Sequence, residues 1–211
     1  MRTIIFATGN QHKLAEAAGI LGEGFHLVTP AECGLVEDIP ETGNSLQANS
    51  LIKAQYIWEH TGGKDCFADD TGLEVEILGG APGIHTARYA GGEGHDADAN
   101  NTKLLMEMAA REYVASAARG LGLKMEHATR RARFRTCVTL ILDGRIHYFE
   151  GTMEGRIALA RSGAEGFGYD PVFISDEYPE CTVAQLLPEV KNSISHRGKA
   201  LRAMAEYLQN L

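Results

Sequence analysis

The fold class follows from residues 3–10, which read Thr3-Ile4-Ile5-Phe6-Ala7-Thr8-Gly9-Asn10. The first five residues are mostly apolar or β-branched, and they predict a short buried strand. The next three favour a turn, and Asn10 is a suitable cap for a helix whose apolar residues recur at helical spacing over residues 14–21. A second helix is expected after Asn44 or Ser45. A strand, a turn and two helices indicate an α/β protein.

Further elements are predicted from short apolar runs and from alternation. Strands are expected at residues 66–68, 133–142 and 147–153, and helices at 100–110 and 199–211. Residues 73–78 are expected to be a strand or extended chain. The strand at 66–68 is expected to end at Asp69-Asp70-Thr71-Gly72. Asp143-Gly144 favours a tight hairpin turn. Gly79–Gly83 and Gly163–Tyr169 are expected to be loops because they are rich in glycine.

Composition excludes several classes of protein. The chain has 211 residues, with 20 Lys+Arg against 28 Asp+Glu and a formal charge of −8, which argues against a non-specific nucleic-acid binder. No apolar run approaches the roughly 18 residues that span a membrane, and the N-terminal stretch lacks a signal-peptide pattern. The four cysteines form no C-x-x-C pair, so neither a disulfide framework nor a zinc ribbon is expected. We therefore expect a cytoplasmic protein that does not bind membranes.

One stretch is basic in spite of the overall charge. Residues 111–135 contain seven Lys/Arg, with only Glu112 and Glu126 as acids. A solvated surface is the favoured interpretation, ahead of a nucleic-acid patch.

Two motifs point to phosphate and metal chemistry. In residues 8–13 a glycine between strand and helix lets backbone N–H groups face an anion, and Lys13 lies in the first helical turn. The alternative is an ordinary turn, since the P-loop pattern is absent. Asp69-Asp70 is a pair of carboxylates after an apolar strand, which suits Mg²⁺ beside a phosphate substrate. An exposed turn is the alternative for this pair.

Three further segments add to this inventory. Glu41-Thr42-Gly43 precedes a helix, where acidic residues are common, and it gains a role only if Glu41 lies near the Asp pair. Gly166–Pro171 sets Phe167, Tyr169 and Asp170 among glycines, which suits either base stacking or anchoring of the core. Ser195–Lys199 places cations at a helix start against the helix dipole, which indicates an anion nearby.

Taken in order along the chain, these stretches resemble the inosine triphosphate pyrophosphatase family. The matching stretches are Ala7-Thr8-Gly9-Asn10-x-x-Lys13, Glu41-Thr42-Gly43 with Asn49 and Lys53-Ala54, Ala68-Asp69-Asp70-Thr71-Gly72-Leu73, Leu78–Gly83, Ala87-Arg88-Tyr89, Gly166–Pro171 and Ser195–Ala200. The chain departs from the family at residues 108–133, which form a longer stretch than usual, and at Pro40, where the family often has an acid. The second metal-binding carboxylate is then Asp38 or Glu41, and Glu41 is favoured.

The resemblance implies an elongated two-lobed α/β fold, with a long mixed central β-sheet flanked by helices and an active-site cleft between the lobes. It implies a single domain over residues 1–211 and a homodimer that hydrolyses the purine nucleoside triphosphates ITP, dITP and XTP to the monophosphate and pyrophosphate, using Mg²⁺. Asp70 matches the catalytic acid and is expected to bind the metal with Glu41. The implied substrate contacts are Thr8, Gly9, Asn10, Gln11, His12, Lys13, Thr71, Phe167, Gly168, Tyr169, Asp170, Lys191, His196 and Arg197.

The expected roles follow from chemistry. Lys13, Lys191 and Arg197 would hold the polyphosphate. Phe167 would stack on the purine, while Asp170 and His196, with Arg197, would contact its edge. From the residues alone, two other classes stay open: a regulator that senses purine nucleotides without hydrolysis, and a general Mg²⁺ phosphatase that releases orthophosphate.

Overall fold

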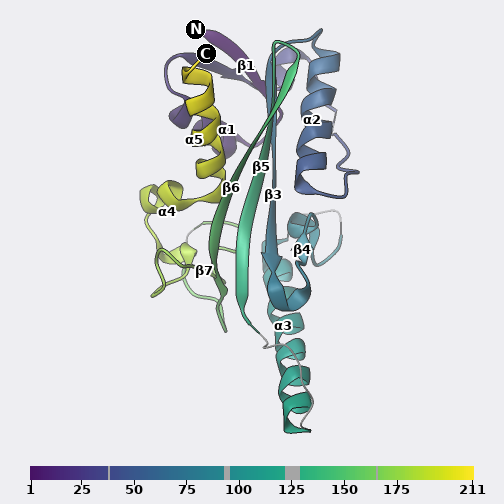
Figure 1. The fold of residues 1–211 in the computed structure, drawn as a ribbon, viewed down its shortest axis with the longest axis vertical. Helices are drawn as coiled ribbons and strands as arrows, with labels where there is room; N and C mark the ends of the chain where they lie inside the picture. The colour runs from purple at the N-terminus through teal and green to yellow at the C-terminus, as the bar shows by residue number, and fades with distance from the viewer. Residues whose placement is uncertain (38, 93–95, 122–128, 165) are drawn as a thin grey trace. The chain divides into compact units, whose positions relative to one another are not determined.

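A computed structural model describes residues 1–37, 39–92, 96–121, 129–164 and 166–211. Its centre is a seven-stranded sheet with the order β2-β1-β3-β5-β6-β7, and β4 pairs with β3 (Figure 1). The strands are β1 (Arg2–Phe6), β2 (Phe25–Val28), β3 (Cys66–Val75), β4 (Pro82–Gly83), β5 (Arg131–Leu142), β6 (Arg145–Ile157) and β7 (Phe173–Ser175). The helices are α1 (Gln11–Leu21), α2 (Leu46–His60), α3 (Ala97–Gly120), α4 (Pro188–Ile194) and α5 (His196–Gln209).

The sheet is mixed. β1 is parallel to both β2 and β3, whereas β4 is antiparallel to β3 and β7 is antiparallel to β6. A mixed sheet flanked by helices is the α/β class expected from the sequence, and that expectation is confirmed.

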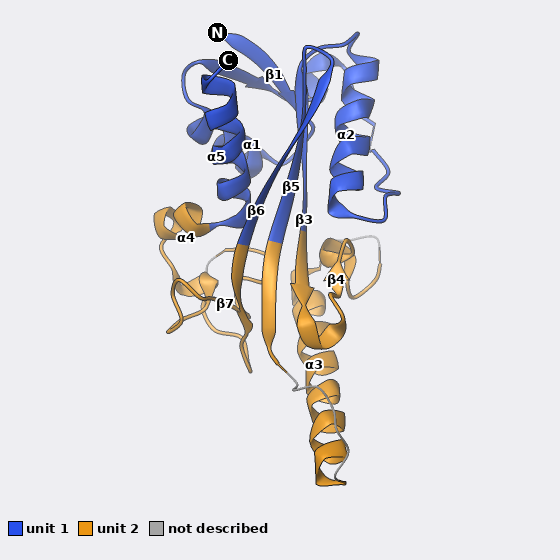
Figure 2. Ribbon diagram, in the orientation of Figure 1, with its two compact units in different colours: residues 1–71, 135–152, 195–211 blue, residues 72–134, 153–194 orange. Residues whose placement is uncertain are grey.

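The chain forms two compact units (Figure 2). Unit 1 comprises residues 1–71, 135–152 and 195–211, and unit 2 comprises residues 72–134 and 153–194. In unit 1 the sheet is covered on both faces. Strand residues such as Phe67 and Leu140 pack against α1 and α5 on one face, while their neighbours Cys66, Ala68 and Ile141 pack against α2 on the other. This division follows from the alternation of side chains along a strand.

Unit 2 has a core of its own. Leu104 and Met108 of α3 are fully buried against strand residues that include Leu73, Val75 and Phe173. The 3-10 turn Val183–Gln185 and the end of α4 close this core through Val183 and Ile194.

Several local predictions are confirmed. Asn10 caps α1 by accepting hydrogen bonds from the backbone N–H groups of His12 and Lys13, and Ser45 caps α2. Asp143 and Gly144 connect β5 to β6 with φ angles of 49° and 74°, as a tight hairpin turn requires.

The predicted end of the strand at Asp69 is wrong. β3 continues through Asp69-Asp70-Thr71-Gly72 to Val75, and both carboxylates are buried inside it. A strand can carry adjacent buried carboxylates when cations meet them on each face, and such partners lie far away in the sequence. The start of the last helix at Ser195–Lys199 is confirmed, since α5 begins at His196, whereas α4 was not predicted.

The basic stretch contains several ion-paired arginines where the structure describes it, and residues 122–128 lie outside the described part. Arg130 forms an ion pair with Glu112, Arg131 with Asp176 and Arg133 with Glu74. These partly exposed pairs support the interpretation of a solvated surface. All four cysteines are free thiols. Within the described residues, no helix is both long and apolar enough to cross a membrane.

Candidate functional site

Asp69 and Asp70 are adjacent on β3, and each meets a different set of partners. Asp69 faces α1 and α5, where Lys13 Nζ lies 2.8 and 2.9 Å from its two carboxylate oxygens and Arg197 Nε lies 3.0 Å from Oδ2. Asp70 faces α2, where Asn49 Nδ2 lies 3.2 Å from Oδ2 and Lys53 Nζ lies 3.3 Å from Oδ1. All of these residues belong to unit 1.

The two carboxylates differ in their electrostatics. Burial alone raises the pKa of Asp69, but the charges of Lys13 and Arg197 outweigh it and hold the pKa below its ordinary value. Burial raises the pKa of Asp70, and Lys53 only partly opposes this effect because the charge of Glu41 works against it. Asp69 is therefore a firmly ionised member of an ion pair, whereas Asp70 binds a proton more readily than an ordinary aspartate.

The turn at residues 8–13 positions Lys13. Thr8 Oγ1 accepts a hydrogen bond from Asn10 N at 3.1 Å, and Asn10 Oδ1 accepts from His12 N at 2.9 Å and Lys13 N at 3.2 Å. The Asn10 side chain therefore accepts hydrogen bonds from two of the backbone N–H groups in the segment that was expected to face an anion. What the turn contributes to the described site is the Lys13 ammonium, placed in the first turn of α1 against Asp69.

Arg197 lies in the first turn of α5 and is only 7% exposed. Besides Asp69, it contacts Glu16, whose Oε2 accepts from a guanidinium N–H at 3.2 Å. The anion expected beside the basic start of this helix is thus provided by the protein's own carboxylates. The helix start abuts β6 at Gly151, where an added Cβ would lie 2.1 Å from His196 O and 2.6 Å from Ala200 N.

Glu41 does join the Asp pair. Lys53 Nζ lies 2.8 Å from Glu41 Oε1, so one ammonium contacts both Glu41 and Asp70. Asn49 Oδ1 accepts from Gly43 N at 2.8 Å, which ties the segment that carries Glu41 to the helix. Gly43 is needed here, since a Cβ would lie 2.7 Å from Asn49 Oδ1.

These residues fit Mg²⁺ in their chemistry. Asp70 and Glu41 direct carboxylate oxygens at one point, which the Lys53 ammonium now contacts, and Mg²⁺ binds through one or two carboxylates, waters and substrate phosphates. Asp69 does not fit, because Lys13 and Arg197 engage its oxygens. The described residues contain no cluster of three or more metal-ligating side chains, and Asp38 lies outside them.

Thr71 and His196, both expected to contact substrate, are joined by a residue that the sequence did not single out. Thr136 Oγ1 on β5 lies 2.7 Å from Thr71 Oγ1 and 2.6 Å from His196 Nδ1. The Thr136 side chain is fully buried.

The expected contacts in unit 2 form their own group. Asp170 Oδ2 accepts hydrogen bonds from Phe167 N at 2.8 Å and from the Lys191 ammonium, which lies 4.4 Å from the centre of the Phe167 ring. Gly168 O accepts from Asn101 Nδ2 at 2.8 Å. Phe167 is 65% exposed and able to stack on a ligand, whereas Tyr169 is buried and donates to Thr86 O. Oδ2 of Asp170 is thus engaged within the loop itself.

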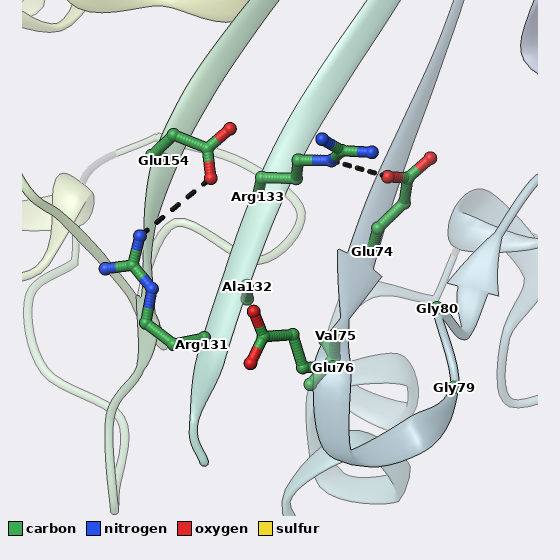
Figure 3. Close-up of a pocket in the computed structure, with 9 residues that line it drawn as sticks. All are labelled: Glu74, Val75, Glu76, Gly79, Gly80, Arg131, Ala132, Arg133 and Glu154. Carbon is green, nitrogen blue, oxygen red and sulfur yellow. Dashed lines mark hydrogen bonds and ion pairs between the residues drawn. The ribbon is translucent and has the colours of Figure 1, made fainter.

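A groove of about 520 Å³ lies elsewhere in unit 2 (Figure 3). Four of its charged side chains form two ion pairs: Arg133 contacts Glu74, and Arg131 reaches toward Glu154. None of the predicted site residues lines this groove.

Four residues of the site were missed or had no role assigned from sequence. Asn49 and Lys53 lie one helical turn apart, and Glu16 lies one turn after Lys13, so helical spacing from a known site residue could have indicated them. Thr136 gives no local signal, because a threonine in a strand is ordinary. The four residues that were missed or had no role assigned are thus Glu16, Asn49, Lys53 and Thr136.

The fold and this site define an α/β protein in which two adjacent carboxylates of a mixed sheet meet lysines from the flanking helices. The chain belongs to the Ham1 family, whose model matches residues 4–207. It is 45% identical over 208 residues to a dITP/XTP pyrophosphatase of Porphyromonas gingivalis. The alignment covers 99% of this chain and 98% of that protein. A dITP/XTP pyrophosphatase of Flavobacterium psychrophilum is 40% identical, with 98% of this chain and 99% of that protein covered.

Solved structures agree with this membership. A Ham1 protein from Coxiella burnetii matches with a TM-score of 0.87 at 32% identity, with both chains covered in full. The Staphylococcus aureus Ham1 protein matches with a TM-score of 0.81 at 32% identity over 99% of each chain. The family resemblance expected from the sequence is confirmed.

Proposed function

We propose that this protein is a Mg²⁺-dependent pyrophosphatase of purine nucleoside triphosphates with non-standard bases, namely ITP, dITP and XTP, which it converts to the monophosphate and pyrophosphate. Its Ham1 membership and its full-length similarity to proteins named dITP/XTP pyrophosphatase support the proposal. The observation that carries the proposal is that the carboxylates of Asp70 and Glu41 both contact the ammonium of Lys53.

The charge of the site explains the need for a metal. Its three cations and four carboxylates give a formal charge of −1, so a polyphosphate is repelled unless a further cation is present. The cations are Lys13, Lys53 and Arg197, and the carboxylates are Glu16, Glu41, Asp69 and Asp70. Mg²⁺, when bound by Asp70 and Glu41, would neutralise phosphate charge and polarise phosphoryl oxygens.

The protein's own groups have distinct tasks in this reaction. Pyrophosphate leaves when water attacks the α-phosphorus, and the transition state spreads negative charge over phosphate oxygens. Lys13 and Lys53 donate hydrogen bonds to those oxygens; the Lys13 side chain is 24% exposed and so accessible to a ligand. Asp70 orients the attacking water and takes its proton.

Other proposed roles differ from the expectation. Arg197 is buried between Asp69 and Glu16, so its role is to hold Asp69, and through it Lys13, in place. Asp170 orders the loop at Phe167 and holds Lys191. The remaining substrate contacts named from the sequence, in residues 8–13 and 167–170 and at Thr71, Lys191 and His196, stay predictions.

Product analysis tests the proposal. Purified protein with Mg²⁺ is given ITP, dITP, XTP, GTP and ATP in parallel, and pyrophosphate and orthophosphate are both measured. We expect pyrophosphate from ITP, dITP and XTP, little from ATP, and loss of activity with a chelator. Orthophosphate as the main product would favour a general phosphatase, and nucleotide binding without any product would favour a regulator.

A homodimer in the cytoplasm belongs to the same proposal. Light scattering coupled to gel filtration tests the dimer, which we expect at about twice the chain mass of 22.9 kDa.

A further inference from the structure

A buried hydroxyl connects two of the predicted substrate contacts. Thr136 projects from β5 onto the face of the sheet that α1 and α5 cover, where its Oγ1 contacts Thr71 of β3 and His196 Nδ1 at the start of α5. Thr136 is 0% exposed. A valine of the same shape would suit this strand position, and burying a hydroxyl costs free energy unless it is hydrogen-bonded, as Thr136 is.

A hydroxyl has one proton to donate and two lone pairs, so two arrangements use the Thr136 proton within this group of three. A third, in which Thr136 accepts from both neighbours, leaves its buried proton without a partner among them. In the first, Thr71 donates to Thr136 and Thr136 donates to His196 Nδ1, which leaves the ring proton on Nε2. In the second, Nδ1 donates to Thr136 and Thr136 donates to Thr71. The 2.6 Å separation between Thr136 Oγ1 and Nδ1 favours the first, because hydroxyl donors form shorter hydrogen bonds than N–H donors.

We infer that Thr136 is a positioning residue that holds His196 in the tautomer protonated on Nε2 and orients the hydroxyl of Thr71. Its consequence for catalysis rests on the proposed function. A ring that donates from Nε2 suits a 6-keto purine, whose O6 accepts, and it opposes the 6-amino group of adenine, which donates. Thr136 thereby contributes to the choice of purine without touching it.

The chain provides a matched control on the same strand. Thr139 is also fully buried, and its Oγ1 lies 2.7 Å from Ser50 Oγ on the opposite face, beside α2. Thr139→Val therefore removes one buried hydroxyl and its hydrogen bond to Ser50 without touching His196. Thr136→Ser keeps the hydroxyl and loses only a methyl group.

The decisive measurement uses no nucleotide. Nitrogen-15 NMR of the full chain at about pH 8, where an ordinary histidine is neutral, reports which ring nitrogen carries the proton. His196→Gln identifies the His196 signals among those of the eight histidines. We expect Nε2 to be protonated in the wild type, in Thr136→Ser and in Thr139→Val, and a mixture of tautomers in Thr136→Val.

Protonation of Nδ1 in the wild type would overturn the inference, and that measurement needs no variant to fold. An unchanged tautomer in a folded Thr136→Val protein would also overturn it. If ITP is hydrolysed, the ratio of kcat/KM for ITP over ATP should fall about tenfold in Thr136→Val and be restored in Thr136→Ser. Absence of hydrolysis in the wild type would refute the proposed function while leaving the tautomer result to decide the inference.

Discussion

Arg197 and Asp69 form a buried ion pair between residues 128 positions apart in the chain, with Arg197 Nε 3.0 Å from Asp69 Oδ2. Arg197 is 7% exposed and Asp69 is 1% exposed, so neither group exchanges its partner for water at low cost. The pair joins the first turn of α5 to the middle of β3. Arg197, which the sequence predicts to contact substrate, is held in this structure by two carboxylates of the protein, those of Asp69 and Glu16.

The first prediction separates the two aspartates. Asp69→Asn leaves Lys13 without its carboxylate and Arg197 with only that of Glu16, and we expect it to lower the free energy of unfolding by about 3–5 kcal/mol. Asp70→Asn removes a charge that folding disfavours, as the raised pKa of Asp70 indicates, so stability should be unchanged or increased while kcat falls by orders of magnitude. Urea unfolding and pyrophosphate release measure both effects. Equal losses of stability in the two variants would contradict this assignment.

The second prediction concerns the metal without nucleotide. Lys53 is the ammonium that contacts both Asp70 and Glu41, so Lys53→Met should tighten Mg²⁺ binding to the free protein by removing a competing cation. Asp70→Asn should abolish that binding. Isothermal titration calorimetry with MgCl₂ measures both. If Lys53→Met binds Mg²⁺ no more tightly than the wild type, the two carboxylates do not form the metal site.

The third prediction concerns the contact between α5 and β6. Gly151→Ala places a Cβ 2.1 Å from His196 O, and backbone must move to relieve the overlap. We expect a loss of several kcal/mol in stability and a lower kcat, because His196 and Arg197 start the displaced helix.

Gly19→Ala is the matched control for this change. Gly19 lies inside α1 with nothing within 4 Å of an added Cβ, so its replacement should raise stability by about 0.5–1 kcal/mol. Thermal unfolding of the two variants measures the contrast. A stable Gly151→Ala protein with normal kcat would show that the helix start tolerates displacement.

The fourth prediction concerns pH. Burial raises the pKa of Cys66 from 9.0 to about 12, so the folded protein keeps a proton that the unfolded chain releases above pH 9. The thiol's contribution to stability is therefore complete below pH 9 and is lost as pH rises from 9 toward 12, at about 1.4 kcal/mol per pH unit.

Urea unfolding between about pH 8 and pH 10.5 tests this sign. The free energy of unfolding should fall by about 1.4 kcal/mol less per pH unit in Cys66→Ala than in the wild type. Cys33→Ser is the control for the loss of a thiol as such, since Cys33 is only partly buried.

Much of unit 1 follows from local sequence. The strand at β1, the Asn10 cap, the helix after it and the Asp143-Gly144 turn are each specified by a few neighbouring residues, because hydrophobic period, capping and turn chemistry act over one or two turns of chain. The family motifs in the same segments indicated the site residues in their order. The helix expected at residues 199–211 was located for the same reason.

Only the tertiary structure decided what each charged residue does. The sequence shows two aspartates in a row, but it does not show that β3 continues through them, and alternation along that strand places them on opposite faces. Asp69 then meets Lys13, 56 positions away, while Asp70 meets the Lys53 that also contacts Glu41. Electrostatic energy depends on distance in space and on burial, and neither is a property of the local sequence.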